Sequence, residues 1–250
     1  MRLRKALLLA LAVVLCALAL AAPAQATIYS GRIYAKGWVS YSGAVWIGAR
    51  ANIEVRNGAI SDADAANGGY AAEALWIGPN MSGTYWVEVG YSRGWGGDNI
   101  VTFYWANRNT TSPYYHEHKV WNLNAAAYVG TSPEFKIVRV GSSDDWNVYI
   151  DGIYANDAGD DHTANTTFTS IDHFDVGLES NCSSGRLGAS TDYVNASTLQ
   201  KKVPSGSWSY GPAYSGFGDG FQLVELNSSS PFAHGAWSTA GQRLWNWRNY

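Results

Sequence analysis

The stretch Thr84-Tyr85-Trp86-Val87-Glu88-Val89-Gly90-Tyr91 predicts a β-strand, because apolar residues occupy every second position from Tyr85 onwards. Successive side chains of a β-strand point to opposite faces of a sheet, so this apolar stripe belongs in a core. Trp86, Glu88 and Gly90 then face the other way. A carboxylate beside a tryptophan, with room for a ligand above the glycine, suits the floor of a cleft. A single solvated glutamate on an outer sheet face fits the same pattern, so a second carboxylate is needed to favour the cleft.

A second strand of this kind lies between Ile171 and Glu179. Its residues alternate cleanly between an apolar face and a polar face. The apolar face consists of Phe174, Val176 and Leu178, and the opposite face of His173, Asp175, Gly177 and Glu179. Glu179 is therefore a second carboxylate on a strand that is backed by an apolar stripe.

The rest of the chain predicts further short strands. They are bounded by turn signals such as Arg56-Asn57-Gly58 and Asp151-Gly152. Alternating or strand-forming residues cover 33–55, 71–77, 100–105, 114–120, 135–140, 146–150 and 220–226, whereas residues 60–69 are predicted to form a surface loop. Many short strands without an amphipathic helix predict an all-β fold, a two-sheet antiparallel β-sandwich of the jelly-roll or concanavalin-like kind.

The composition agrees with this fold and excludes one class of partner. Trp (12), Tyr (16) and Gly (27) are heavily used and charged residues make up only 15%, which favours strands and turns over helices. The formal net charge of −3 provides no basic footprint for nucleic acid. We therefore expect no nucleic-acid partner.

The first 26 residues predict a secretory signal peptide. Basic residues at the start precede an apolar run from Ala6 to Leu20, and Ala24-Gln25-Ala26 is a cleavage signal. The predicted organisation is a signal peptide over residues 1–26 and a single β-sandwich domain over residues 27–250. No later apolar run is long enough to span a membrane, so we expect a secreted, extracellular protein without membrane contact after cleavage.

Cysteine and histidine provide few candidates for a reactive or metal site. Cys182 is the single cysteine after residue 26, so it has no partner for an internal disulfide and is expected to be a small buried or surface thiol. The pair His116 and His118 shares one face of a predicted strand and could form half of a metal site. Without a positioned third ligand, two exposed strand histidines are the simpler interpretation. No metal and no cofactor are expected.

Two strand carboxylates facing away from the core can work as an acid–base pair. In a close pair one carboxyl group holds a proton while the other is ionised. The ionised member activates water and the protonated member donates to the leaving group. Peptide hydrolysis and glycoside hydrolysis both use such pairs, and both occur on β-sandwiches, so the fold does not choose between them.

Several motifs, read in order, resemble those of the neprosin-type glutamic peptidases. They are Tyr41-Ser42-Gly43-Ala44, Ala51-Asn52-Ile53-Glu54-Val55, Leu75-Trp76-Ile77, Val87-Glu88-Val89-Gly90-Tyr91 and Tyr104-Trp105. The glutamate of the family's [IV]-E-x-G motif falls on Glu88. The family's second glutamate ends a W-G-G-E-like strand, which Val176-Gly177-Leu178-Glu179 resembles without its tryptophan and one glycine.

This resemblance implies a secreted, acid-acting endopeptidase that favours bonds next to proline, with Glu88 and Glu179 as the catalytic dyad. Tyr104 is the candidate donor to the developing oxyanion. Trp86, Trp95 and Asp175 join Tyr104 as candidate substrate-binding residues, and the expected partner is a polypeptide substrate.

Two alternatives stay open. The first is a non-catalytic carbohydrate-binding sandwich, which the supply of aromatic residues such as Trp95, Trp208 and Trp245 favours. The second is a two-carboxylate glycosidase that uses the same glutamates. In either case the partner is a polysaccharide.

Overall fold

A computed structural model of the protein describes residues 28–40, 43–79, 84–109, 115–182, 184–185, 187, 194–210, 221–225, 232–236 and 243–248. Side chains are described for those of these residues that lie between 43 and 210. The predicted signal peptide lies outside the described residues, as do the side chains of Trp245 and Trp247.

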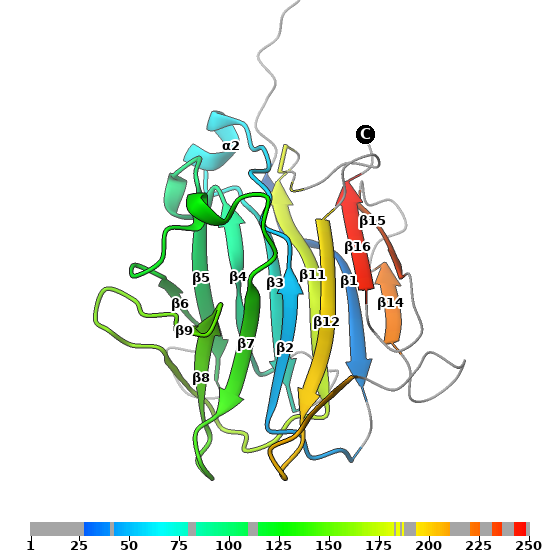
Figure 1. Ribbon diagram of the computed structural model, residues 1–250. Coiled ribbons are helices and arrows are strands. Elements are labelled where there is room, and N and C mark those ends of the chain that lie inside the picture. Colours follow the sequence, from blue (N-terminus) through cyan, green and yellow to red (C-terminus); the bar gives the residue numbers. More distant parts are fainter. Residues whose placement is uncertain are drawn as a thin grey trace, which may run out of the picture.

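Two antiparallel sheets stack face to face, which confirms the predicted all-β sandwich (Figure 1). The first sheet has seven strands in the order β14 (Phe221–Glu225), β1 (Ile28–Ser40), β11 (His173–Cys182), β3 (Ala71–Gly78), β4 (Trp86–Arg93), β5 (Val101–Arg108) and β6 (Tyr115–Lys119).

The second sheet has nine strands. Its main path runs β10 (Thr163–Asn165), β8 (Asp145–Ile150), β7 (Glu134–Arg139), β2 (Gly48–Ile53), β12 (Val194–Lys202), β16 (Arg243–Arg248) and β15 (Phe232–Ala236). Off this path, β13 (Trp208–Tyr210) pairs with β12 and β9 (Ile153–Tyr154) pairs with β8. Every segment predicted to be extended therefore contains at least one strand.

The core lies between the sheets and is built by the alternation that the sequence shows. In β4, Val87, Val89 and Tyr91 are fully buried in the interior cluster. Side chains from the two sheets meet directly there, as where Phe103 of β5 packs edge-to-face on Phe135 of β7 with ring centroids 5.8 Å apart. The other face of β4 therefore points outwards from the seven-stranded sheet, as predicted.

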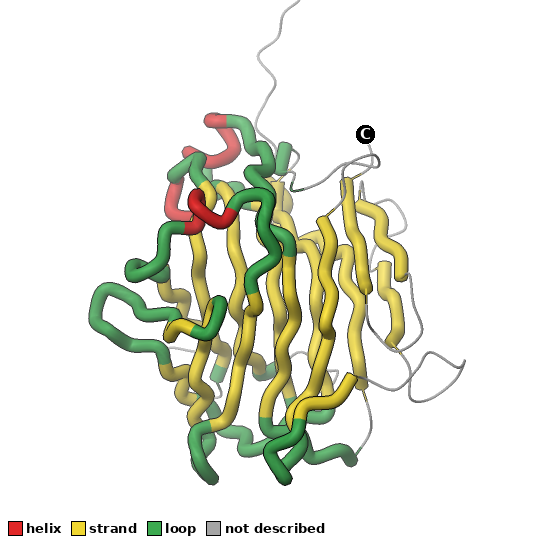
Figure 2. Tube along the Cα trace, in the orientation of Figure 1, coloured by secondary structure: helices red, strands yellow, loops and turns green. Residues whose placement is uncertain are grey.

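Short helices cluster at one end of the sandwich (Figure 2). The prediction of a loop over residues 60–69 is wrong in part, because this segment contains the helix α2 (Asp62–Ala66). Ser61 caps it, with its hydroxyl oxygen accepting a hydrogen bond from the backbone N–H of Asp64 at 3.1 Å. A helix of five residues is too short to show a helical period in the sequence.

Two 3₁₀ turns complete the elements, η1 (Trp95–Gly97) and η2 (Ala125–Tyr128). Gly94, which precedes η1, has a φ of 93°, a left-handed conformation that glycine adopts without strain. None of the helices among the described residues has both the length and the apolar character needed to cross a membrane.

Candidate active site

A pocket of about 250 Å³ opens on the outer face of the seven-stranded sheet. Glu88 of β4 and Glu179 of β11 both line it, together with Tyr104 of β5 and Trp95 of η1. The two glutamates are nearly inaccessible to solvent, at 4% and 6% exposure. The structure therefore brings together the two predicted catalytic residues and two of the predicted substrate-binding residues.

The register of the strands explains how these residues meet. Glu179 lies opposite Ala72 of β3, and Ala72 lies opposite Ser92 of β4. Glu88 is four residues away from Ser92 along the same strand. The Cα atoms of the two glutamates are thus offset by two strands and four residues, which corresponds to roughly 16 Å. The two carboxylates flank the pocket from opposite sides.

Small residues form the sheet surface between the two glutamates. The row midway between them consists of Gly177, Ala74 and Gly90, and it ends at Tyr104. Because three neighbouring positions carry at most a methyl group, the row provides a shallow floor. The buried phenol of Tyr104 rises at one end of this floor.

Gly90 has a structural role in addition to the predicted one. A Cβ atom at this position would collide with the backbone carbonyl oxygen of Glu73 and lie 2.6 Å from the Cβ of Ala74. The close approach of β3 therefore requires glycine at position 90. Room for a ligand follows from the whole row of small residues.

Tyrosine side chains hold both glutamates. The hydroxyl of Tyr70 donates a short hydrogen bond to Oε1 of Glu179. The hydroxyl of Tyr115 lies 3.5 Å from Oε1 of Glu88 and donates to it. Both tyrosines also line the pocket. Each carboxylate is therefore oriented by a phenol from a neighbouring segment.

Tyr104 lies within the electrostatic influence of both glutamates. Its burial, followed by the negative charges of Glu88 and Glu179, raises the pKa of the phenol well above its ordinary value. The hydroxyl thus stays protonated and able to donate. Among the described residues it has no hydrogen-bond partner, although the side chain is only 4% exposed. A donor without a protein partner at the wall of a pocket is available to a ligand.

A second hydroxyl in the pocket wall is also unsatisfied. Ser92 lines the pocket and is 2% exposed, and its Oγ has no hydrogen-bond partner in the part of the chain that the structure describes. Two hydroxyl groups, of which that of Ser92 is buried, therefore border the pocket without a partner among the described residues.

The residues that line this pocket and that the sequence analysis missed include Tyr70, Ser92, Tyr115 and Glu117. The prediction for β6 considered only its two histidines. Tyr115, Glu117 and Lys119 alternate with them and lie on the opposite face of the strand. Glu117 lies in the same row as Glu88, with Ala106 between them. The alternation in residues 115–119 could have identified Glu117, but only the strand order places it beside Glu88.

Two predicted substrate-binding residues lie outside the pocket lining. Trp86 shares its face of the sheet and packs against Tyr115, with ring centroids 6.4 Å apart. Asp175 is separated from Glu88 by Trp76, and a carboxylate oxygen of Asp175 lies 2.5 Å from Nε2 of His173. The structure therefore places Trp86 behind Tyr115 and Asp175 beyond the tryptophan of β3.

The histidine pair of β6 points to the interior side of its sheet. His116 and His118 share a face, as predicted, but they are half-buried, and His118 stacks on Trp105 with ring centroids 3.7 Å apart. The expectation of two exposed histidines is therefore wrong. The cause is the position of Trp105, which lies opposite His118 on β5.

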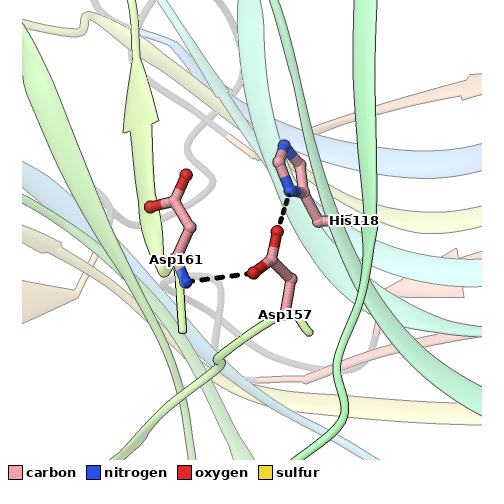
Figure 3. A group of neighbouring side chains, drawn as sticks. All are labelled: His118, Asp157 and Asp161. Carbon is pink, nitrogen blue, oxygen red and sulfur yellow. Dashed lines mark hydrogen bonds and ion pairs between the residues drawn. The ribbon is translucent and has the colours of Figure 1, made fainter. Parts of the chain in front are cut away.

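Figure 3 shows His118, Asp157 and Asp161 as neighbouring side chains. Their possible ligand atoms lie within 4.8 Å of one another. Nδ1 of His118 lies 2.7 Å from Oδ2 of Asp157. Oδ1 of Asp157 accepts hydrogen bonds from the backbone N–H groups of Gly159 and Asp161, at 2.7 and 3.0 Å. These contacts fasten the loop that carries Asp157 to β6.

The sequence itself matches no protein-family model, and a search of curated proteins finds no match. Solved structures are similar in fold, and they place the chain in a structural class. The two-sheet sandwich has the fold of the glutamic peptidases.

Two of these structures illustrate the likeness. One is scytalido-glutamic peptidase with a peptide-based transition-state analogue, at 9% identity and a TM-score of 0.51, covering 89% of this chain and 100% of that chain. Another is SCP-B, a member of the eqolisin family of peptidases, in a complex with the tripeptide Ala-Ile-His. It has 10% identity and a TM-score of 0.50, with the same coverage of 89% and 100%. At this identity the likeness concerns the fold alone.

Proposed function

We propose that this chain is a peptide hydrolase in which Glu88 and Glu179 act as the acid–base pair and Tyr104 as the oxyanion donor. One observation carries the proposal: both buried glutamates and the unpartnered hydroxyl of Tyr104 border a single pocket. The fold that the chain shares with glutamic peptidases supports the same class of reaction.

The proposed reaction uses one ionised and one protonated carboxyl group, which face the substrate from opposite sides of the pocket. The ionised glutamate takes a proton from a water molecule, and the resulting hydroxide attacks the carbonyl carbon of the scissile peptide bond. Negative charge develops on the carbonyl oxygen, to which Tyr104 donates a hydrogen bond. The protonated glutamate then donates to the amide nitrogen, the C–N bond breaks, and the amine leaves.

The need for one protonated carboxyl group predicts activity in acid. When both carboxyl groups are ionised no general acid remains, so cleavage falls as pH rises. The motif resemblance to neprosin-type glutamic peptidases, centred on Glu88 and Glu179, adds a preference for bonds next to proline. The N-terminal segment supports the proposal that the enzyme acts outside the cell.

Digestion of a denatured, proline-containing protein between about pH 3 and 7 tests the proposal. We expect cleavage at the acidic end that Glu88→Gln and Glu179→Gln each abolish. Asp144→Asn is the matched control, because Asp144 is exposed at the turn before β8 in the other sheet. Circular dichroism verifies that each variant is folded. Correctly folded wild-type protein that cleaves nothing across this range contradicts the proposal.

A second candidate function, carbohydrate binding, has one specific observation in its favour. Trp121 is 67% exposed, and Nζ of Lys119 lies 5.8 Å from its ring and 5.9 Å from that of Trp95. An exposed indole such as that of Trp121 can stack on a sugar ring, near Trp95 of the pocket lining. Screening the protein on a glycan array, with Trp121→Ala for comparison, tests this function independently of cleavage.

A further inference from the structure

Three carboxylates meet in the same pocket, one more than an acid–base pair requires. Glu117 joins Glu88 and Glu179 in the lining, and it is the exposed member of the three. The lining residues that the structure describes include no lysine, arginine or histidine. Like charges gathered around a small volume attract a cation.

Two cations near this lining, Lys119 and Arg108, have contacts of their own outside it. Nζ of Lys119 lies 3.7 Å from a carboxylate oxygen of Asp98. The guanidinium of Arg108 lies over the ring of Trp86, 5.1 Å from its centroid. Neither side chain is among the residues that line the pocket. The charged side chains that the structure describes in this lining are therefore all carboxylates.

The uncharged groups of the pocket also suit a cation. The buried, unpartnered Oγ of Ser92 can accept a hydrogen bond, and so can the hydroxyl oxygen of Tyr104. Trp95, Tyr104 and Tyr115 supply aromatic walls, and aromatic faces attract ammonium and guanidinium groups. A lysine or arginine head group carries donors and no acceptor, so it complements a pocket that is rich in acceptors.

We infer that the pocket selects polypeptide substrates by a lysine or arginine side chain, with Glu117 as the residue that determines this preference. The inference rests on the proposed peptidase function and adds the class of substrate. Glu117 lies two strands across the sheet from Glu88, with Ala106 of β5 between them. A cationic side chain held there leaves its own backbone over the floor between Glu88 and Glu179.

The experiment uses pairs of peptides that differ only in one charge. Lysine is moved through each position of an otherwise neutral peptide, and each member has an Nε-acetylated twin. Calorimetry at neutral pH and low salt measures binding, and kcat/KM measures cleavage in acid. We expect the best-placed lysine to improve both by about fivefold over its twin, as one partly exposed ion pair provides.

The variant Glu117→Gln is expected to bring the ratio between the lysine peptide and its acetylated twin close to one, whereas Asp144→Asn keeps this ratio. High salt is expected to reduce the ratio as well, because salt screens exposed charges. Equal binding of twins at every position, or a ratio that Glu117→Gln does not change, overturns the inference.

The two proposals fail in different ways. Cleavage in acid without a lysine preference leaves the peptidase proposal intact and overturns the cation pocket. Selective binding of the lysine peptides by a protein that cleaves nothing supports the cation pocket and contradicts the peptidase proposal.

Discussion

Glu88 and Glu179 face one pocket from strands that β3 separates, and the register places them four residues apart along the sheet. The row of small residues between them leaves space for a peptide backbone. Tyr104 stands at the end of this row, and both negative charges act on its phenol. This relationship makes the pair part of a binding site, which neither glutamate alone would indicate.

Replacing Tyr104 by phenylalanine removes the hydroxyl and keeps the ring. If the hydroxyl stabilises the developing oxyanion, kcat should fall by about 10²- to 10³-fold with little change in KM. The melting temperature should not fall, because the hydroxyl has no hydrogen-bond partner among the described residues. Steady-state kinetics and a thermal melt measure the two effects. A variant with wild-type kcat would remove Tyr104 from the reaction.

Replacing Gly90 by alanine should destabilise the sheet at the floor of the pocket. The added methyl group collides with the backbone of β3, so the two strands must separate at a cost of about 3 kcal/mol. Urea denaturation measures the free energy of unfolding. Gly159→Ala is the control, since its Cβ would meet only Oδ1 of Asp157 at an ordinary 3.4 Å. Equal stability of Gly90→Ala and wild type would contradict the close packing of β3 on β4.

Asp157 should contribute stability that acid removes. Burial alone would raise the pKa of its carboxyl group, but hydrogen bonds from His118, Gly159 and Asp161 outweigh it and lower the pKa. A pKa that is lower in the folded chain adds stability at every pH above the unfolded value. That stability disappears as pH falls through the folded value.

We therefore expect Asp157→Asn to lose about 1 kcal/mol of unfolding free energy at neutral pH, the contribution of one such hydrogen bond. The difference in unfolding free energy between the variant and wild type should close below about pH 4, near the ordinary pKa of aspartate. Urea unfolding at several pH values measures the gap, and Asp144→Asn should show none. A gap that persists unchanged into acid would show that the hydrogen bonds of Asp157 do not depend on its charge.

Cys182 should be unreactive in the folded protein. Its side chain is fully buried, and this burial raises the pKa of the thiol. The thiolate is the reactive form, so a chromogenic thiol reagent should modify the native protein far more slowly than the urea-unfolded chain. Rapid modification of the native protein would mean that the segment around Cys182 opens readily.

Local alternation predicted much of this molecule because a strand has a period of two. The sequence alone assigned Val87 and Val89 to the core and Glu88 to the opposite face, and the structure agrees. The same reasoning placed the side chain of Glu179 on the sheet face opposite to that of Leu178. It could not show that the close approach of β3 requires glycine at position 90, because no local pattern reveals the neighbour across the sheet.

Which strands lie side by side, and so which of their side chains share a site, depends on the tertiary structure. The order β11, β3, β4, β5, β6 puts Glu179, Glu88 and Glu117 around one pocket, although 91 residues separate the first two in the chain and 29 the last two. It also brings Asp157 to His118 from a distant loop. Pairing between remote strands depends on how the whole core packs, so no stretch of sequence contains it. The sequence determined the face of each carboxylate, and strand order determined which carboxylates share a site.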